Sequence, residues 1–326
     1  MSSEPLRLGW IGLGSMGFAM ALNIQKHLQT HKLPPLHCWN RTISRGDPLR
    51  AFGSVLCESV AEVVQNSDVI FISVSNDDAL KSVVDDIITS GPIKDKIIVD
   101  TTTVHPNTSA ATTAQFRDAH ADYIAAPVFG ATPLAQAGAL LIAVAGPPTS
   151  IALIRPFLAG VTARAVIDVG PVPQQALLLK TTSNFLTAGL MYLLSEAHTL
   201  AEKAGLPAAV LESLVEQNFG AYAHGVSARM TGGAYFPAEG QAPASGLGLA
   251  IKDVGHGVSV AMGVGMQLKA GELSVAAMEE ARVFGGAVGR ELDSSSVFGV
   301  VRQRAGLEFA TEEVKRRDEM MREEKG

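Results

Sequence analysis

This chain contains few cysteines and has no excess of positive charge. Its 326 residues include only two cysteines, Cys38 and Cys57, which is too few for a disulfide framework and fits a reducing compartment. Lysine and arginine number 26 against 32 acidic residues, so the formal net charge of −6 argues against the basic face that nucleic-acid binding needs. No apolar run approaches the roughly 20 residues of a membrane helix. We therefore expect no nucleic acid and no membrane among its partners.

Targeting and metal-binding signals are also missing. The first residues lack the basic and apolar segments of a secretory signal, so a cytoplasmic location is the expectation. Three histidines, His198, His224 and His256, are scattered without the spacing of metal ligands. We expect structural roles for them and no metal.

The first half of the chain alternates short β-branched runs with helical stretches, which is the pattern of a parallel sheet with crossover helices. Strands are predicted at 6–11, 36–40, 53–56, 69–74, 97–100, 123–126, 140–144 and 165–169. Helices are predicted at 16–29, 60–65, 79–88 and 108–119. These elements predict an α/β domain with a doubly wound Rossmann sheet.

Beyond Asp168 strand signals nearly vanish. One long, largely apolar helix is predicted from Gln174 to Ala204, with later helices at 208–217, 250–262, 268–284 and 311–325. With 47% hydrophobic residues, a chain of this length has enough core for two domains. We place the boundary near Gly170, giving a Rossmann domain over 1–170 and an all-helical domain over 171–326 for substrate binding and dimerisation.

A glycine-rich turn carries the clearest chemical signal. It follows the first strand, opens the first helix and reads Gly12, Leu13, Gly14, Ser15, Met16, Gly17. The first glycine permits the tight turn, the second lets the backbone approach a pyrophosphate, and the third lets the helix pack against the strand. The free N–H groups of the helix N-terminus favour an anion. This turn predicts a dinucleotide site.

The second strand ends in Asn40, Arg41 and Thr42. An NAD site would place a carboxylate here for the ribose hydroxyls, and that carboxylate would repel the extra phosphate of NADP. Asn40 removes the repulsion, and Arg41 supplies a planar cation for the adenine or the 2′-phosphate, with Arg45 to assist. We expect NADP(H) as cofactor in preference to NAD.

Together these motifs resemble the β-hydroxyacid dehydrogenase family, which includes 3-hydroxyisobutyrate dehydrogenase. The match is strongest to the glyoxylate/succinic semialdehyde reductases over 9–17, 40–63 and 100–106, and remains recognisable to about Val300. The resemblance implies a second cofactor patch formed by Val74, Ser75 and Thr103, and a later lysine, Lys252 of the Lys252-Asp253 pair, that reaches the cofactor. It also implies a homodimer or homotetramer.

The resemblance further implies that Lys180 and Asn184 are the catalytic pair, because Lys180-Thr181-Thr182-Ser183-Asn184 matches the family's active-site helix. The substrate loop departs from the family pattern, since it reads Pro127-Val128-Phe129-Gly130-Ala131 where Pro-Val-Ser-Gly-Gly is usual. Phe129 therefore replaces a serine that helps to hold a substrate carboxylate. Phe129, Gly130 and Ala131 remain the predicted substrate-binding residues.

The residues themselves support a role for Lys180. An ammonium group inside an apolar helix is costly unless it meets a cavity, water or a partner. Asn184 lies one turn later on the same face, and Thr187 and Ala188 extend that face with small side chains. Partial burial would lower the pKa of the lysine, which suits a group that donates and accepts a proton.

The sequence thus predicts an NADP(H)-dependent oxidoreductase that interconverts a small hydroxy compound or β-hydroxy acid and its aldehyde or keto form. An imine reductase is the alternative within the same architecture, although such enzymes typically lack a lysine at this helix position. A non-catalytic NADP-binding scaffold is the alternative from another class. The retained Lys180, Asn184 and Lys252 argue against both.

Overall fold

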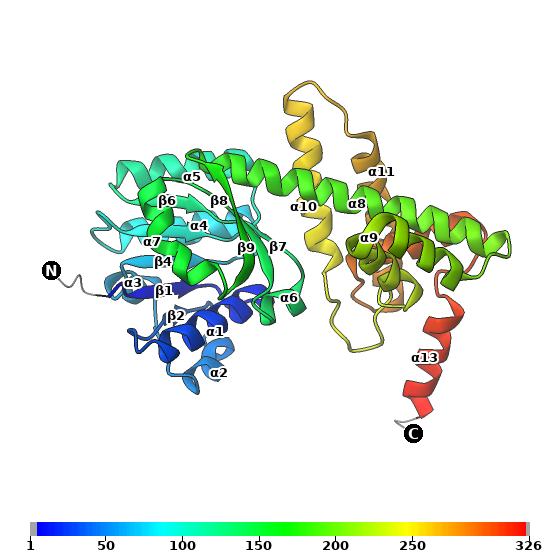
Figure 1. Cartoon of the computed structure of the whole chain (residues 1–326), viewed down its shortest axis with the longest axis horizontal. Coiled ribbons are helices and arrows are strands. Elements are labelled where there is room, and N and C mark those ends of the chain that lie inside the picture. The colour runs from blue at the N-terminus through cyan, green and yellow to red at the C-terminus, as the bar shows by residue number, and fades with distance from the viewer. Residues whose placement is uncertain (1–4, 324–326) are drawn as a thin grey trace. The chain divides into compact units, whose positions relative to one another are not determined.

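The computed structural model describes residues 5–323 and divides into two compact units (Figure 1). The first unit ends at Lys180 and the second begins at Thr181. Their border falls inside a helix, ten residues after the predicted boundary at Gly170, where the last strand ends. None of the helices described is long and apolar enough to cross a membrane.

The first unit is built on a sheet of nine strands within the described residues. Parallel pairing joins the strands in the order β3-β2-β1-β4-β5-β6. Strand β8 follows β6 and also pairs with β7 and, in parallel, with β9. The strands are β1 (Leu8–Ile11), β2 (His37–Trp39), β3 (Val55–Leu56), β4 (Val69–Ile72), β5 (Ile97–Asp100), β6 (Asp122–Ala125), β7 (Val128–Phe129), β8 (Leu140–Ala145) and β9 (Ala163–Gly170). Because the strand order reverses between β1 and β4, this sheet has the switch point at which Rossmann folds bind their ligands.

Helices cover both faces of this sheet (Figure 1). They are α1 (Ser15–Thr30), α2 (Asp47–Arg50), α3 (Val60–Gln65), α4 (Asp77–Thr89), α5 (Pro106–Asp118), α6 (Thr132–Gln136) and α7 (Pro148–Leu158), with a 3₁₀ turn at Ile43–Gly46. Successive strand residues point to opposite faces, so Ile70 packs in one core cluster and Phe71 in the other. Burial on both faces explains why these strands read as continuous apolar runs.

The predicted Rossmann fold is confirmed, but two local expectations are wrong. The sheet is not entirely parallel, because β8 runs antiparallel to both β6 and β7. Four short or interrupted elements were not predicted: β7, α2, α6 and α7. Helix α7 begins at Pro148 and contains Pro156, a composition that favours a loop on local grounds alone.

The second unit is all-helical, as predicted. Its elements are the later part of α8 (Pro173–Lys203), then α9 (Ala208–Thr231), α10 (Leu247–Gly263), α11 (Lys269–Val288), a 3₁₀ turn (Ser294–Ser296), α12 (Val297–Arg304) and α13 (Glu312–Glu323). Helix α12 was not predicted, and α9 runs beyond its predicted end. The last predicted helical residues, 324 and 325, lie outside the described residues.

An aromatic cluster forms the core of the second unit. Tyr235, Phe236, Phe298 and Phe309 pack with ring centroids 5.2–6.4 Å apart. Phe284 stacks on Phe309 at 3.8 Å. Arg229 and the fully buried Asp293 form an ion pair, and Asp293 also accepts hydrogen bonds from the backbone N–H groups of residues 245 and 295. These contacts hold the segment that precedes α10.

Candidate functional site

The glycine-rich turn has the geometry that a pyrophosphate needs. Gly12 has φ +99°, and a Cβ atom there would lie 2.2 Å from the Ser73 carbonyl oxygen. A Cβ atom on Gly17 would lie 2.3 Å from the Gly12 carbonyl oxygen, so both glycines are required by close backbone packing. Gly14, which precedes the first residue of α1, has no atom within 4 Å of its Cβ position.

Open space at Gly14 coincides with an uncapped helix N-terminus. No side chain caps α1, and its first turn carries no acidic residue. The first N–H groups of the helix and its dipole therefore favour a phosphate at this point. Leu13, Ser15 and Met16 lie on this turn beside Gly14, as the sequence predicts. The residues present fit a dinucleotide.

Asn40 is part of the turn's support. Its Oδ1 accepts a hydrogen bond from the Leu13 N–H (2.8 Å), and its Nδ2 donates to the Thr42 carbonyl oxygen (2.9 Å). A carboxylate in this place could not make the second bond, because it has no donor when ionised. Asn40 therefore ties the end of β2 to the phosphate-binding turn.

Arg41, Thr42 and Arg45 are exposed beyond Asn40. Within residues 5–323 neither arginine forms an ion pair, whereas nearby Arg50 lies 3.6 Å from Asp47. Two uncompensated guanidinium groups thus stand where the second strand ends. This place in the fold is where a Rossmann site receives the adenosine ribose.

The second predicted cofactor patch is formed by two adjacent strand ends. Val74 and Ser75 follow β4, Thr103 follows β5, and the Val74 N–H donates to Thr102 Oγ1 (3.2 Å). Thr101 Oγ1 in turn donates to the Ile72 carbonyl oxygen (2.8 Å). These bonds fix both segments at the carboxyl edge of the sheet.

Asp100 anchors the same patch from inside the core. It is 1% exposed and accepts hydrogen bonds from the Thr102 N–H (2.9 Å) and the Tyr123 hydroxyl (2.8 Å). Burial raises the pKa of Asp100 to about 6, and these hydrogen bonds oppose that rise. Asp100 is the last residue of β5. Its position supports a structural role, because its partners are backbone and a buried phenol.

The predicted substrate loop lies between β7 and α6, next to the glycine-rich turn. Pairing of Phe129 with Leu141 in the antiparallel strand β8 places that side chain, and Gly130 follows with φ +131°. Ala131 is the residue before α6. Thr132 Oγ1 donates to Met16 Sδ at 3.7 Å, so this loop contacts the first turn of α1.

Lys180 belongs to the first unit through the start of α8. Ala176 and Leu177 are fully buried in the core cluster against which Phe129 also packs. Lys180 Nζ lies 5.0 Å from the centroid of the Phe129 ring, within the range of a cation–π interaction. The structure therefore brings the predicted catalytic lysine to the predicted substrate loop.

Asn184 and Lys252 lie together in the second unit. Asn184 Nδ2 donates to Asp253 Oδ2 at 3.2 Å, and Lys252 Nζ lies 3.0 Å from Asp253 Oδ1. Gly257, one turn after Asp253, packs against α8, with its Cβ position 3.4 Å from the Thr181 carbonyl oxygen. Asp253 thus orients Asn184, a contact that the Lys-Asp pair in the sequence did not reveal.

Three further contacts were missed at the sequence level. His198 and His224 are not scattered, because they lie 3.6 and 3.4 Å from the same carboxylate, Glu212. Burial lowers the pKa of His198, and Glu212 opposes this. Among the described residues no group of three or more potential ligands is arranged to hold a metal ion.

The third contact that the sequence did not reveal joins Thr187 of α8 to Tyr222 of α9, with 2.6 Å between their side-chain oxygens.

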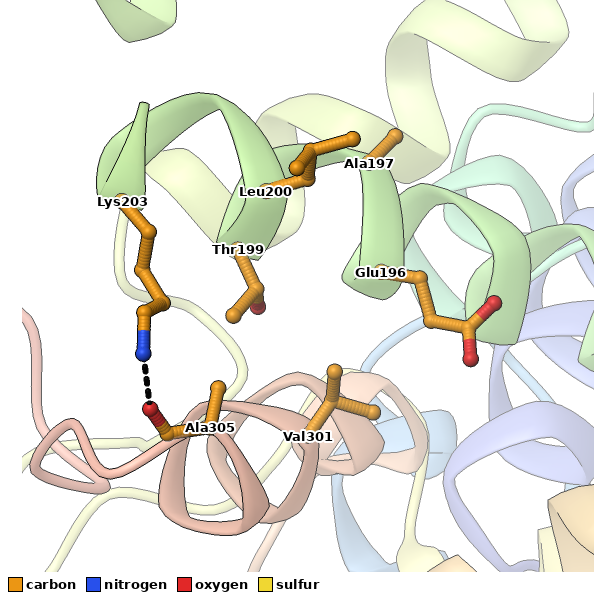
Figure 2. A pocket seen from close by; sticks show the side chains of 7 residues that line it. All are labelled: Glu196, Ala197, Thr199, Leu200, Lys203, Val301 and Ala305. Carbon is orange, nitrogen blue, oxygen red and sulfur yellow. Dashed lines mark hydrogen bonds between the residues drawn. The ribbon is translucent and has the colours of Figure 1, made fainter. Parts of the chain in front are cut away.

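A hollow of about 460 Å³ lies elsewhere, between α8 and α12 in the second unit (Figure 2). Its lining is mostly apolar and contains none of the predicted site residues; it consists of Glu196, Ala197, Thr199, Leu200, Lys203, Val301 and Ala305. Lys203 Nζ donates to the Ala305 carbonyl oxygen (2.5 Å) and closes one end.

Comparison with known proteins agrees with this arrangement. Residues 7–170 match the family model described as the NAD binding domain of 6-phosphogluconate dehydrogenase. An NADH-dependent oxidoreductase of Aspergillus ustus is 28% identical over 299 residues, which cover 91% of this chain and 99% of that protein. The 2-(hydroxymethyl)glutarate dehydrogenase of Eubacterium barkeri is 27% identical over 306 residues, covering 93% and 97%.

Among solved structures, a 3-hydroxyisobutyrate dehydrogenase of Mycobacterium tuberculosis superimposes with a TM-score of 0.77. The two chains are 20% identical, and the match covers 91% of this chain and 99% of the other. At this identity the likeness shows a shared fold.

Proposed function

This chain is a pyridine-nucleotide-binding oxidoreductase of the β-hydroxyacid dehydrogenase family, and from this premise we propose that it interconverts a small hydroxy compound and its carbonyl form with NADP(H). The observation that carries the proposal is the placement of Lys180 Nζ over the Phe129 ring, beside the loop that contacts the glycine-rich turn. A protonatable group and a nucleotide site thus belong to one compact unit.

Each part of the first unit has a task in this reaction. The turn at Gly12–Gly17 binds the pyrophosphate at the N-terminus of α1, and Val74, Ser75 and Thr103 contact the cofactor farther along the sheet edge. When bound, the dihydronicotinamide supplies a hydride to the carbonyl carbon. The protein has to orient the carbonyl group and deliver the proton.

Lys180 supplies that proton to the carbonyl oxygen, and in the opposite direction it removes the proton of the hydroxyl group. Asn184, one turn later on α8, holds the same oxygen in place, and Asp253 fixes the Asn184 amide by accepting its N–H. Lys252 Nζ contacts the same Asp253, and we propose Lys252 as a further cofactor-binding residue. A non-catalytic NADP-binding scaffold would have no need of these positioned side chains.

The substitution Lys180→Ala tests the mechanism. We expect kcat to fall by about 10²–10⁴-fold, the usual contribution of a general acid, with NADPH affinity nearly unchanged. Lys26→Ala is the matched control, because Lys26 Nζ lies 5.2 Å from the Phe52 ring and reproduces the lysine–phenylalanine contact away from the site. Loss of NADPH binding in the Lys180 variant would contradict the proposed role.

The substrate panel should contain carbonyl compounds and cyclic imines with NADPH as reductant. Phe129 offers no hydroxyl to a substrate carboxylate, so we propose a substrate whose acyl or side-chain group is less polar than glyoxylate. Gly130 and Ala131 leave the loop free of larger side chains at this point. Turnover of imines alone would favour the imine reductase alternative, and oxidation of NADPH by no member of the panel would favour the scaffold.

Preference for NADP(H) rests on Asn40, Arg41 and Arg45. The side chain of Asn40 brings no charge to the ribose position, and both arginines are exposed. Arg41 binds the 2′-phosphate and Arg45 assists it. The Aspergillus ustus relative is named as NADH-dependent, and steady-state kinetics with NADPH and NADH test the preference of this chain.

We also propose self-association as a homodimer or homotetramer. Leu186, Leu193 and Leu200 repeat every seven residues along α8 and are 63%, 65% and 70% exposed. A row of exposed leucines at this spacing is typical of a helix that packs against another helix. The hollow in Figure 2 adjoins Leu200 and continues the apolar surface onto α12.

A further inference from the structure

Asp100 is a buried carboxyl group at the edge of the sheet where the second cofactor patch lies. It is 1% exposed, and its partners within residues 5–323 are hydrogen-bond donors and no cation. Burying an acidic group without a cation is costly, because the charged form loses its hydration. A neutral residue would avoid this cost, so packing alone does not explain a carboxyl group at this position.

Three donors converge on this carboxyl group. The Thr102 N–H and the Tyr123 hydroxyl donate to it at 2.9 and 2.8 Å, and the Thr102 hydroxyl is also hydrogen-bonded to it. An ionised carboxylate can accept all three bonds, since it carries acceptors only. A protonated carboxyl group brings a hydrogen of its own, which has to displace one of these donors. The arrangement therefore suits the ionised form.

Thr102 passes this restraint to the neighbouring strand end. With its proton directed at Asp100, the Thr102 hydroxyl oxygen accepts the Val74 N–H at 3.2 Å. Val74 and Ser75 follow β4, and Thr103 comes directly after Thr102. One carboxyl group thus holds both segments of the second cofactor patch, and all of these residues belong to the first unit.

We propose that Asp100 is a positioning residue for the nicotinamide nucleotide, and that its ionised form holds the second cofactor patch in the conformation that binds the nucleotide. Because Asp100 is buried, it acts through Thr102 and Val74 and not by contact with the ligand. Loss of its charge releases the Thr102 hydroxyl group and, with it, the Val74 N–H. This assignment rests on the proposed cofactor contacts of Val74, Ser75 and Thr103.

The groups around Asp100 set the pH range in which its charge matters. Burial raises the pKa of Asp100 to about 6, and the carboxylate of Asp77 at the start of α4 adds to the rise. Hydrogen bonds from Thr102 and Tyr123 oppose it. His105, at the N-cap of α5, donates its backbone N–H to Asp77. Since Asp100 is ionised only above its raised pKa, nucleotide affinity should be lost as the pH falls through about 6.

Asp100→Asn tests the role of the charge. At about pH 8 we expect a Kd for NADPH about 3–10-fold above that of the wild type in a fluorescence titration, which is the value of one hydrogen bond. At about pH 5 the wild-type carboxyl group is itself protonated, so the two Kd values should agree within about twofold. Comparison of the two proteins at the same pH cancels protonation of the cofactor's own phosphate groups.

Tyr123→Phe gives a second measurement that keeps the carboxyl group. It removes a hydrogen bond that lowers the pKa of Asp100, so the pH at which NADPH affinity falls should move upward relative to the wild type. A merely structural role would lower the melting temperature and leave this pH profile in place. Should Asp100→Asn fail to fold, the shift in Tyr123→Phe still decides the question.

Asp122→Asn is the matched control. Its carboxylate also accepts a hydrogen bond from a hydroxyl group, that of Ser150, but it lies at the start of β6 and so at the opposite edge of the sheet. It should leave the Kd for NADPH at the wild-type value at both pH values. An Asp100→Asn variant that binds NADPH like the wild type at about pH 8, or more weakly by the same factor at both pH values, would overturn the assignment.

Failure of the proposed function is seen separately. If the wild-type chain binds NADPH and reduces no carbonyl compound, the proposed reaction is wrong, and the titrations still decide the role of Asp100. If it reduces carbonyl compounds and the ratio of the two Kd values does not depend on pH, only the role of Asp100 is wrong.

Discussion

Arg41 is the residue whose charge we expect to decide between the two nicotinamide cofactors. Replacing it with alanine should raise the KM for NADPH by about 10–100-fold, because hydrogen bonds to charged groups contribute about 1.5–3 kcal/mol. The KM for NADH should change less than twofold, since NADH has no 2′-phosphate. Steady-state kinetics with both cofactors measure this difference.

Arg50→Ala is the control for Arg41, because Arg50 is also exposed near the end of β2 but lies beside Asp47. It should leave both KM values unchanged. Equal effects of Arg41→Ala on NADPH and NADH would show that the guanidinium does not recognise the extra phosphate.

At the level of single residues, the sequence predicted the chemical groups at the site better than it predicted their hydrogen-bond partners. The absence of an acidic residue at position 40 was readable, but the two hydrogen bonds of Asn40 depend on how β2 and the glycine-rich turn meet in space. The same is true of Tyr222 and Thr187, which are 35 residues apart in the sequence. Contacts of this kind arise from tertiary packing, which local sequence patterns do not reveal.

The turn before α1 allows a test that separates folding from ligand binding. Gly14 has φ −68° and open space at its Cβ position, so Gly14→Ala should change the free energy of unfolding by less than about 0.5 kcal/mol. The added methyl group would still occupy the space that a pyrophosphate needs, and NADPH affinity should fall at least tenfold. Thermal unfolding and fluorescence titration measure the two effects.

Gly17→Ala is the comparison for this element. Its Cβ atom would lie 2.3 Å from the Gly12 carbonyl oxygen, so we expect a loss of about 1–3 kcal/mol in stability even without cofactor. A Gly14 variant that binds NADPH as tightly as the wild type would place the pyrophosphate elsewhere.

The buried strands and the longest helix were predictable. Burial on both faces gives β4 and β5 apolar runs, and α8 has a long apolar sequence of its own. Strand β7 was missed because its two residues acquire strand geometry only by pairing with β8. The antiparallel direction of β8 was missed for the same reason, since strand direction leaves no local sequence signal. Phe129, the residue that departs from the family pattern, lies on this missed strand.

For the whole molecule, the exposed leucines of α8 predict the oligomeric state. The triple variant Leu186→Gln, Leu193→Gln, Leu200→Gln should lower the mass measured by light scattering to about that of one chain, 34.1 kDa. Leu153→Gln, which changes a 50% exposed leucine on α7, should leave the mass of the assembly unchanged. A wild-type chain that already has the mass of a monomer would refute self-association.

Helix α8 also constrains how this protein can vary. Its first turns are buried in one unit, its later turns belong to the other, and Lys180 and Asn184 lie four residues apart on either side of the border. One inserted residue between them would rotate every later side chain by about 100° around the helix axis. The number of residues between Lys180 and Asn184 is therefore fixed by the pitch of a single helix.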